Sequence, residues 1–142
     1  MNKKIMTGAA VAIVAAGAIY LGLLRPDTTV AADNSAGKPM VDVTIPELTG
    51  AEKVGEQIFN AKCAVCHGAA AAGNEGAGPP LVHKIYEPGH HGDMSFMLAP
   101  RRGVRAHHWP FGDMPPIEGL TDGDLIQIIA YVRKLQRANG IN

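Results

Sequence analysis

The sequence predicts an all-α fold, a small helical domain preceded by a single N-terminal transmembrane helix. Segments 51–62 and 121–136 place apolar residues at the spacing of three and four that marks an amphipathic helix. No alternating apolar and polar run, which would indicate a β-strand, surrounds the two cysteines. Residues 5–24 carry no charge, and a helix of about 20 such residues is long enough to cross a bilayer.

Length and composition allow one domain with an appendage. The 142 residues contain 13 basic and 13 acidic side chains, so bulk charge indicates no nucleic-acid partner. We expect a membrane anchor at 1–25, a flexible linker rich in Pro, Thr, Asp, Ser, Gly and Ala at 26–50, and a domain at 51–142. Aromatic residues make up only 5% of the chain, and a domain this small commonly needs a metal or cofactor to supplement its core.

The charged residues around the apolar run predict its orientation. Lys3 and Lys4 precede it, which favours a cytoplasmic N-terminus with everything after Arg25 outside. Alternatively the run is a signal peptide cleaved after Val30-Ala31-Ala32. The run is longer than the apolar core of a typical signal peptide, which favours the anchor, and the domain is exported in both cases.

The helix at 51–62 leads directly into the motif C-A-V-C-H at residues 63–67. A C-x-x-C-H motif is the attachment signature of c-type haem. The spacing places both thiols, Cys63 and Cys66, on one side of a helical turn, where they can add to the haem vinyl groups, and His67 can then reach the iron. In bacteria this attachment takes place outside the cytoplasm, which agrees with an exported domain in the periplasm.

Two other interpretations of the cysteine pair are weaker. A thioredoxin-type disulfide would require a βαβ context, which the surrounding sequence lacks. A zinc site would require a second pair of ligands at matching spacing, and the chain has no further cysteine.

The residues after the motif suggest how His67 is oriented. A Gly- and Ala-rich loop at 68–78 leads to Pro79 and Pro80, which have fixed φ angles and no backbone N–H. The Pro79 carbonyl could accept the Nδ1 proton of His67 and leave Nε2 for the iron. Spacing alone fits an ordinary turn equally well. Further on, Asp93 can cap a short helix that ends at Gly103, and Pro100 within it predicts a kink or two short pieces.

The loop at 104–116 holds the favoured sixth ligand of the iron. Met114 is flanked by prolines, lies well after His67 in the chain and precedes the last helix. A thioether opposite an imidazole favours ferrous iron and raises the reduction potential. The competing ligands are Met94 and Met97 or, alternatively, His107 and His108, and any single Met can simply fill the core.

Two residues of the same loop are candidate partners of the haem propionates. Arg105, with Arg101 and Arg102 just before it, could pair with a propionate, although a solvated basic surface is the plainer interpretation. Trp109 could donate its indole N–H to a propionate or simply pack.

The segment 121–136 is the clearest helix in the chain. Thr121 is placed to cap it, with acidic residues in the first turn and basic residues near the end, as the helix dipole favours. Its predicted buried stripe consists of Leu125, Ile128, Ile129, Val132 and Leu135.

Residues 51–138 resemble the class I cytochromes c in these successive elements: helix, C-x-x-C-H, Gly-Pro-x-Leu turn, Met-Pro loop and closing helix. The resemblance implies that the first and last helices cross at Gly55, Phe59 and Tyr131. It also implies that the Pro79 carbonyl orients His67 and that Met114 is the sixth ligand. With the apolar N-terminus, the chain looks like the membrane-anchored bacterial members that carry electrons between a quinol-oxidising complex and a terminal oxidase.

We therefore expect a one-electron carrier of a bacterial respiratory chain with one covalent haem c, which docks redox partner proteins and needs no small-molecule substrate. An enzyme or sensor for peroxide or nitric oxide, with five-coordinate iron and His107 or His108 as acid–base group, is the first alternative. The second is a copper-handling haem protein that uses the His- and Met-rich segment 83–114.

Overall fold

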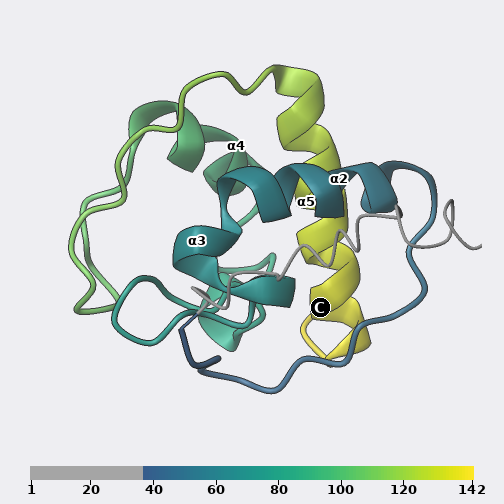
Figure 1. The fold of residues 1–142 in the computed structure, drawn as a ribbon, viewed down its shortest axis with the longest axis horizontal. Helices are drawn as coiled ribbons and strands as arrows, with labels where there is room; N and C mark the ends of the chain where they lie inside the picture. The colour runs from purple at the N-terminus through teal and green to yellow at the C-terminus, as the bar shows by residue number, and fades with distance from the viewer. Residues whose placement is uncertain (1–36) are drawn as a thin grey trace, which may run out of the picture. The chain divides into compact units, whose positions relative to one another are not determined.

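The computed structural model describes residues 37–142, which belong to one compact unit. Its helices are α2 (Gly50–Lys62), α3 (Ala64–His67), η1 (Ala69–Ala71), η2 (Lys84–Tyr86), α4 (Asp93–Arg102) and α5 (Asp122–Ala138) (Figure 1). The described residues contain no strand, and two isolated β-bridges are the only β-type pairings among them. The all-α prediction for the domain is therefore confirmed.

Helices α2 and α5 cross in close contact, at the residues that the resemblance implied (Figure 1). Gly55 is buried, and a Cβ atom placed on it would lie 2.0 Å from the backbone oxygen of Gln127. Beside it the Phe59 and Tyr131 rings, both buried, lie 5.5 Å apart between centroids. Only glycine lets the two backbones approach this closely, and the aromatic pair fills the space next to the crossing.

Local hydrogen bonds set the ends of both helices. Glu52 accepts from the backbone N–H of Thr49 at 3.2 Å, before α2. At the start of α5, Asp124 accepts from the backbone N–H of Thr121 at 2.8 Å, and the Thr121 hydroxyl accepts from that of Asp124 at 3.2 Å. These are capping boxes, in which each side chain satisfies a backbone group that the helix leaves free. The predicted cap at Thr121 is confirmed, and Asn139 is the C-cap of α5.

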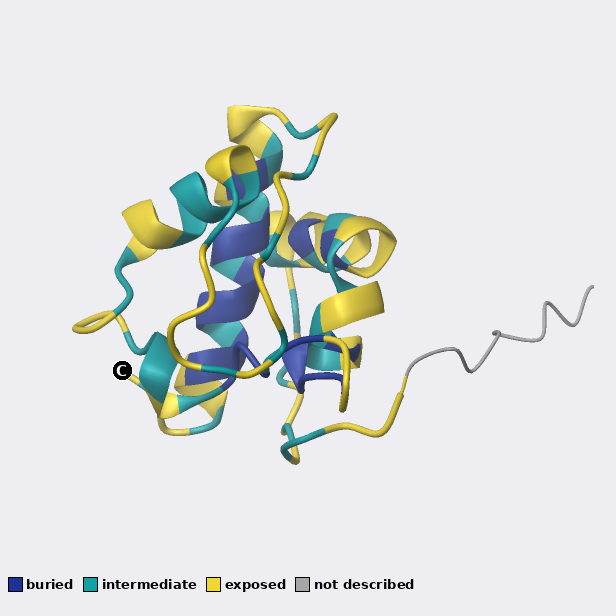
Figure 2. Ribbon diagram, turned by 90° about the vertical axis from the view of Figure 1, so that its left-hand side faces the viewer, coloured by how far each residue is buried: buried dark blue, intermediate teal, exposed yellow. Residues whose placement is uncertain are grey.

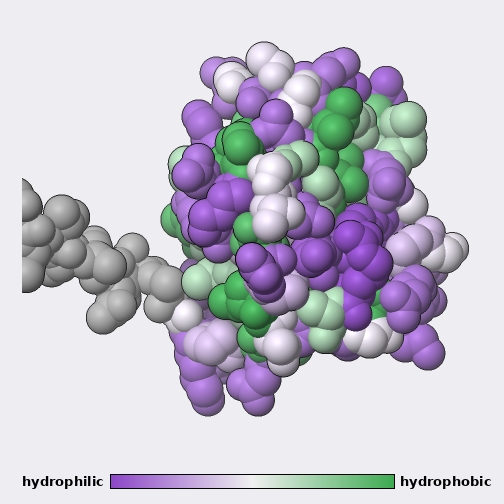
Figure 3. Space-filling model, turned by 90° about the vertical axis from the view of Figure 1, so that its right-hand side faces the viewer, coloured by the Kyte–Doolittle hydropathy of each residue, from purple (hydrophilic) through white to green (hydrophobic). Residues whose placement is uncertain are grey.

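The core of the domain lies along one side of α5, where buried residues form a continuous line (Figure 2). All five residues of the predicted stripe are buried. The face shown in Figure 3 carries apolar side chains in several separate groups among polar ones. The apolar sides of amphipathic helices meet in the interior, so the surface keeps only separate apolar groups between polar side chains.

Helix α4 corrects two expectations. Its N-cap is Gly92, and Asp93 is the first helical residue, whose carboxylate instead accepts from Arg133 Nε at 2.7 Å. Of the two predicted alternatives, a kink or two short pieces, the division into two pieces is wrong, because one helix of 10 residues runs through Pro100. Pro100 lies in the last turn, where its missing N–H removes a single intrahelical bond.

Residues 38–44 of the predicted linker are bound to the domain. Met40 donates its N–H to Ala72 O at 3.0 Å, and Thr44 exchanges two hydrogen bonds of 2.9 Å with the Asn139 side chain. Met40 is therefore held against the loop that follows the cysteine motif, and Thr44 against the C-terminal end of α5.

The predicted anchor at 1–25 and the alternative cleavage site at Ala32 lie outside the described residues. Between residues 37 and 142, every helix is too short or too polar to traverse a bilayer.

Candidate functional site

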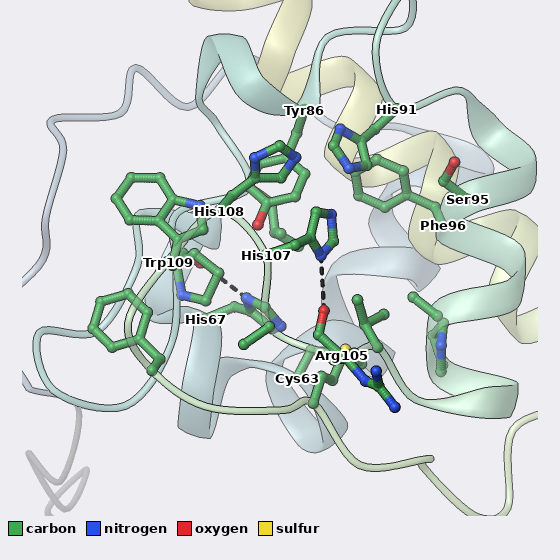
Figure 4. Close-up of a pocket in the computed structure, with 18 of the residues that line it drawn as sticks. Cys63, His67, Tyr86, His91, Ser95, Phe96, Arg105, His107, His108 and Trp109 are labelled. Atoms are coloured by element: carbon green, nitrogen blue, oxygen red, sulfur yellow. Dashed lines mark hydrogen bonds between the residues drawn. The ribbon is translucent and has the colours of Figure 1, made fainter.

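A cavity of about 380 Å³ opens between α2, α4, α5 and the loop at 104–114 (Figure 4). Its size falls in the range of small-molecule and cofactor sites, and its walls are mainly apolar. The lining includes six of the seven residues that sequence reasoning assigned to haem contacts: Cys63, His67, Pro79, Arg105, Trp109 and Met114. Of the predicted site residues only Cys66 does not line it, and Phe59, assigned to the helix crossing, does.

The cysteine-bearing turn lies at one wall of the cavity. The amide of His67 donates to Cys63 O at 2.9 Å, which closes the turn. Cys63 is half-buried and lines the cavity, and Cys66 is exposed. Burial, with a smaller contribution from the nearby Cys66, raises the pKa of the Cys63 thiol to about 11.

His67 is held in one orientation by a backbone carbonyl. Its Nδ1 lies 2.9 Å from Pro79 O, and the bond is drawn in Figure 4. Burial lowers the pKa of His67, and the bond to Pro79 opposes this effect only in part. The ring is therefore neutral at pH 7, with its proton on Nδ1 and the lone pair on Nε2. This is the hydrogen bond that the resemblance implied.

The loop that carries Met114 is closed at its base. Val104 and Met114 form an antiparallel bridge with two N–H···O bonds of 2.9 Å each, and Asp113 accepts from the Ala106 N–H at 2.8 Å. The bridge fixes Met114 at the cavity wall. The two predicted axial ligands, which lie 47 residues apart in the chain, thus line one cavity.

Trp109 contributes a buried donor that is not used within the described residues. Its Nε1 is inaccessible to solvent and has no hydrogen-bond partner there. Burial raises the pKa of the adjacent Tyr86, with the Trp109 indole opposing this, but the two groups do not meet in a hydrogen bond of normal geometry. A buried N–H without an acceptor is costly, so this donor fits a ligand oxygen.

The arginines before the loop do not share one role. Arg105 is exposed and lines the cavity, as a partner of a propionate should. Arg101 pairs with Asp122 at the start of α5 instead. Of these two, only Arg105 is therefore available to a group in the cavity.

Sequence reasoning missed the residues that support the cavity from behind. Arg133 was expected only as a favourable charge near the end of α5, but its side chain is 6% exposed. It donates hydrogen bonds to Tyr86 O at 2.8 Å, to the carboxylate of Asp93 and to the carbonyl of His91. Gln136 is fully buried and donates to Leu81 O at 2.8 Å and Tyr86 O at 3.0 Å. Together they hold the irregular segment 81–93 against α5. A polar residue in phase with the apolar stripe was the only available signal.

Four histidines of the His- and Met-rich segment 83–114, the segment named in the copper-handling alternative, also gather at this cavity. His91, His107 and His108 line it, and the His90 ring lies 5.3 Å from that of His108. Partial desolvation and the nearby His107, His91 and His90 lower the pKa of His108.

The family model for cytochrome c matches residues 52–136, which include both crossing helices, the cysteine turn and the Met114 loop. The chain belongs to the cytochrome c family. A search of the curated proteins found no match. This cytochrome therefore binds a covalent c-type haem with its iron, and Cys63 and Cys66 have the spacing that attachment requires. Family membership supports a haem-based electron carrier that works with redox partner proteins.

The described residues fit a haem. The cavity is apolar, as a porphyrin requires, and is lined by one thiol of the motif and by a histidine with Nε2 free. The unpaired indole N–H and the exposed guanidinium of Arg105 offer donors to carboxylates. The group also supplies the aromatic area that the sequence lacks.

Proposed function

We propose that this cytochrome is a one-electron carrier of a bacterial respiratory chain, with His67 and Met114 as the axial ligands of its haem iron. The observation that carries the proposal is the shared cavity of the oriented His67 imidazole and the bridge-held Met114 thioether. The haem iron supplies the chemistry by alternating between its ferric and ferrous states. With ligands on both sides, no position is left open for a substrate.

The residues of the chain set the properties of that site. The Pro79 carbonyl keeps the proton on Nδ1 of His67, which maintains Nε2 as the ligand atom and increases its basicity. The Val104–Met114 bridge reduces the entropy lost when the thioether is ordered. The mainly apolar wall excludes water and, like thioether ligation, favours the less charged ferrous state.

Replacement of Met114 tests the ligand assignment. A Met114→Ala variant should lose the long-wavelength sulfur-to-iron charge-transfer band of the ferric protein and should bind carbon monoxide when reduced. Met94→Ala is the matched control, because Met94 is 65% exposed on α4 and does not line the cavity. If the band survives in Met114→Ala, Met114 is not the sixth ligand.

One observation favours a second candidate. His107 also lines the cavity, and its Nδ1 lies 2.7 Å from Arg105 O, which leaves Nε2 unprotonated, as in His67. In a five-coordinate enzyme or sensor for peroxide or nitric oxide, His107 would serve as the acid–base group. Carbon monoxide or cyanide binding by the unmodified protein would favour this candidate over an electron carrier.

We further propose that residues 5–24 anchor the cytochrome in the inner membrane with the haem domain in the periplasm, where it carries electrons from a quinol-oxidising complex to a terminal oxidase. Support comes from the length of the uncharged run and from Lys3 and Lys4 before it. Anchoring would raise the effective concentration of the carrier near membrane-bound partners. Reduced-minus-oxidised spectra of membrane and soluble fractions test the location, because cleavage near Ala32 would release the haem signal into the soluble fraction.

A further inference from the structure

The histidine cluster at the cavity has the geometry of a metal site. One ligand nitrogen from each of His90, His91 and His108 lies within 4.8 Å of the other two. The Nε2 atoms of His90 and His108 are only 3.4 Å apart. In Figure 4, the His91 and His108 rings lie on the side of the pocket away from Cys63. His67, the proposed histidine ligand of the iron, does not belong to this cluster, although His91 and His108 line the same cavity.

The two segments that carry these histidines are both held in place. His91 Nδ1 lies 2.6 Å from Ile85 O, which puts the proton on Nδ1 and leaves Nε2 with its lone pair. The backbone oxygen of His91 accepts from the buried Arg133 side chain. His108 lies in the loop that the Val104–Met114 bridge closes. A histidine whose second nitrogen is bound to a carbonyl is the usual arrangement of a metal ligand, because that bond fixes tautomer and orientation.

The facing nitrogens of His90 and His108 offer a further argument. Two imidazole nitrogens at this distance repel if both carry lone pairs or both carry protons, so they satisfy each other only when one of the two is protonated and the other is not. A metal ion accepts all the lone pairs at once. His90 and His108 are exposed, so an ion can reach them from solvent.

The ligand type selects the class of metal. Imidazole suits copper, zinc and nickel, and affinity for a given nitrogen site rises to its maximum at Cu²⁺. The cluster contains no carboxylate, which disfavours Ca²⁺ and Mg²⁺. Three protein ligands leave at least one coordination position for water or another ligand.

We propose that His90, His91 and His108 bind one divalent transition-metal ion, Cu²⁺ in preference to Zn²⁺, at the edge of the haem cavity. The methionines of the segment are not part of the site. Met94 lies on α4 in a shallow depression with Ile126 and Arg137, which is distinct from the haem cavity.

The test uses the untagged, haem-loaded full chain. Calorimetric titration with Zn²⁺ should give one saturable site per molecule, and Cu²⁺ should displace the bound Zn²⁺. His90→Ala and His108→Ala should each weaken Zn²⁺ binding by more than about 100-fold, since loss of an outer-shell partner already costs about 10–100-fold. Met94→Ala should bind Zn²⁺ and Cu²⁺ like the unmodified protein.

Absorption spectra of every variant establish that the haem domain is folded. Absence of saturable Zn²⁺ and Cu²⁺ binding overturns the proposal, and so does undiminished affinity in both histidine variants. Loss of Cu²⁺ binding in Met94→Ala would assign the site to different ligands and would also overturn it. None of these results depends on whether Met114 binds the haem iron, so the two proposals can fail independently.

Discussion

The contact between α2 and α5 at Gly55 allows a quantitative prediction for Gly55→Ala. The new Cβ would lie 2.0 Å from Gln127 O, whereas Cβ contacts under 3.0 Å are essentially never found. The obstacle is backbone rather than a flexible side chain, so the helices must move apart. Because this crossing forms the centre of the fold, the separation also loosens the packing of Phe59 against Tyr131.

Two opposing effects decide the magnitude. Replacing a glycine inside a helix by alanine stabilises it by about 1 kcal/mol through helix propensity. Overpacking in a close contact costs about 1–3 kcal/mol, and a clash with backbone belongs at the upper end. We therefore expect Gly55→Ala to lower the free energy of unfolding by about 2 kcal/mol, and its Tm by about 8–16 °C for a domain of this size.

Gly123→Ala is the matched control. Gly123 also lies within a helix, α5, but a Cβ there would meet nothing nearer than the Thr121 hydroxyl at 3.7 Å. This variant should be as stable as the unmodified protein or more stable, by up to about 1 kcal/mol. Thermal and denaturant unfolding of the haem-loaded proteins, followed by circular dichroism, measures both. If Gly55→Ala is stabilised like the control, the close helix contact described here is wrong.

Four further predictions address the site and its support. Trp109→Phe should lower the haem reduction potential in a spectroelectrochemical titration, because a propionate that loses this donor retains more negative charge and favours ferric iron; an unchanged potential would mean that the indole N–H does not contact the haem. Arg133→Met should cost about 1–3 kcal/mol in denaturant unfolding, because the part-buried carbonyl of His91 loses its donor. Full stability would remove Arg133 from the support of the cavity. Burial, with a smaller effect of Glu56, raises the pKa of Tyr131 to about 12. The unfolded chain therefore releases this proton first, and the free energy of unfolding should fall as pH rises from about 10 toward 12. Tyr131→Phe should lose less stability over that interval, and equal losses would contradict the raised pKa of Tyr131. Zn²⁺ at the histidine site should raise the haem reduction potential, because added positive charge nearby favours ferrous iron; a lowered potential would argue against binding beside the haem cavity.

Features encoded in short stretches of the chain were predictable from the sequence. The capping residue Thr121 and the stripe of α5 act over one to a few helical turns, so spacing alone reveals them. The C-x-x-C-H motif specifies the haem because its chemistry needs five consecutive residues. Gly55, Phe59 and Tyr131 followed from the family resemblance rather than from spacing.

The arrangement of polar groups was decided by the tertiary structure. Spacing left the contact of His67 with Pro79 undecided, because a Pro-Pro turn has many possible neighbours. Arg133 is indistinguishable in sequence from a solvated cation near a helix end, and it is buried because carbonyls of segment 81–93 need donors. Asp93 pairs with Arg133 instead of capping α4, and these two residues lie 40 positions apart in the chain.

By itself, the sequence determined the haem attachment, the helical class and the apolar side of each long helix, because these depend on neighbours along the chain. Only the tertiary structure decided which polar groups from distant parts of the chain meet. His90 and His108 lie 18 residues apart, and their Nε2 atoms come within 3.4 Å because Arg133 and the Val104–Met114 bridge fix the two segments that carry them. The Arg133 bonds and the Val104–Met114 bridge satisfy backbone groups that no helix or strand pairs, and these partners depend on how the whole domain packs.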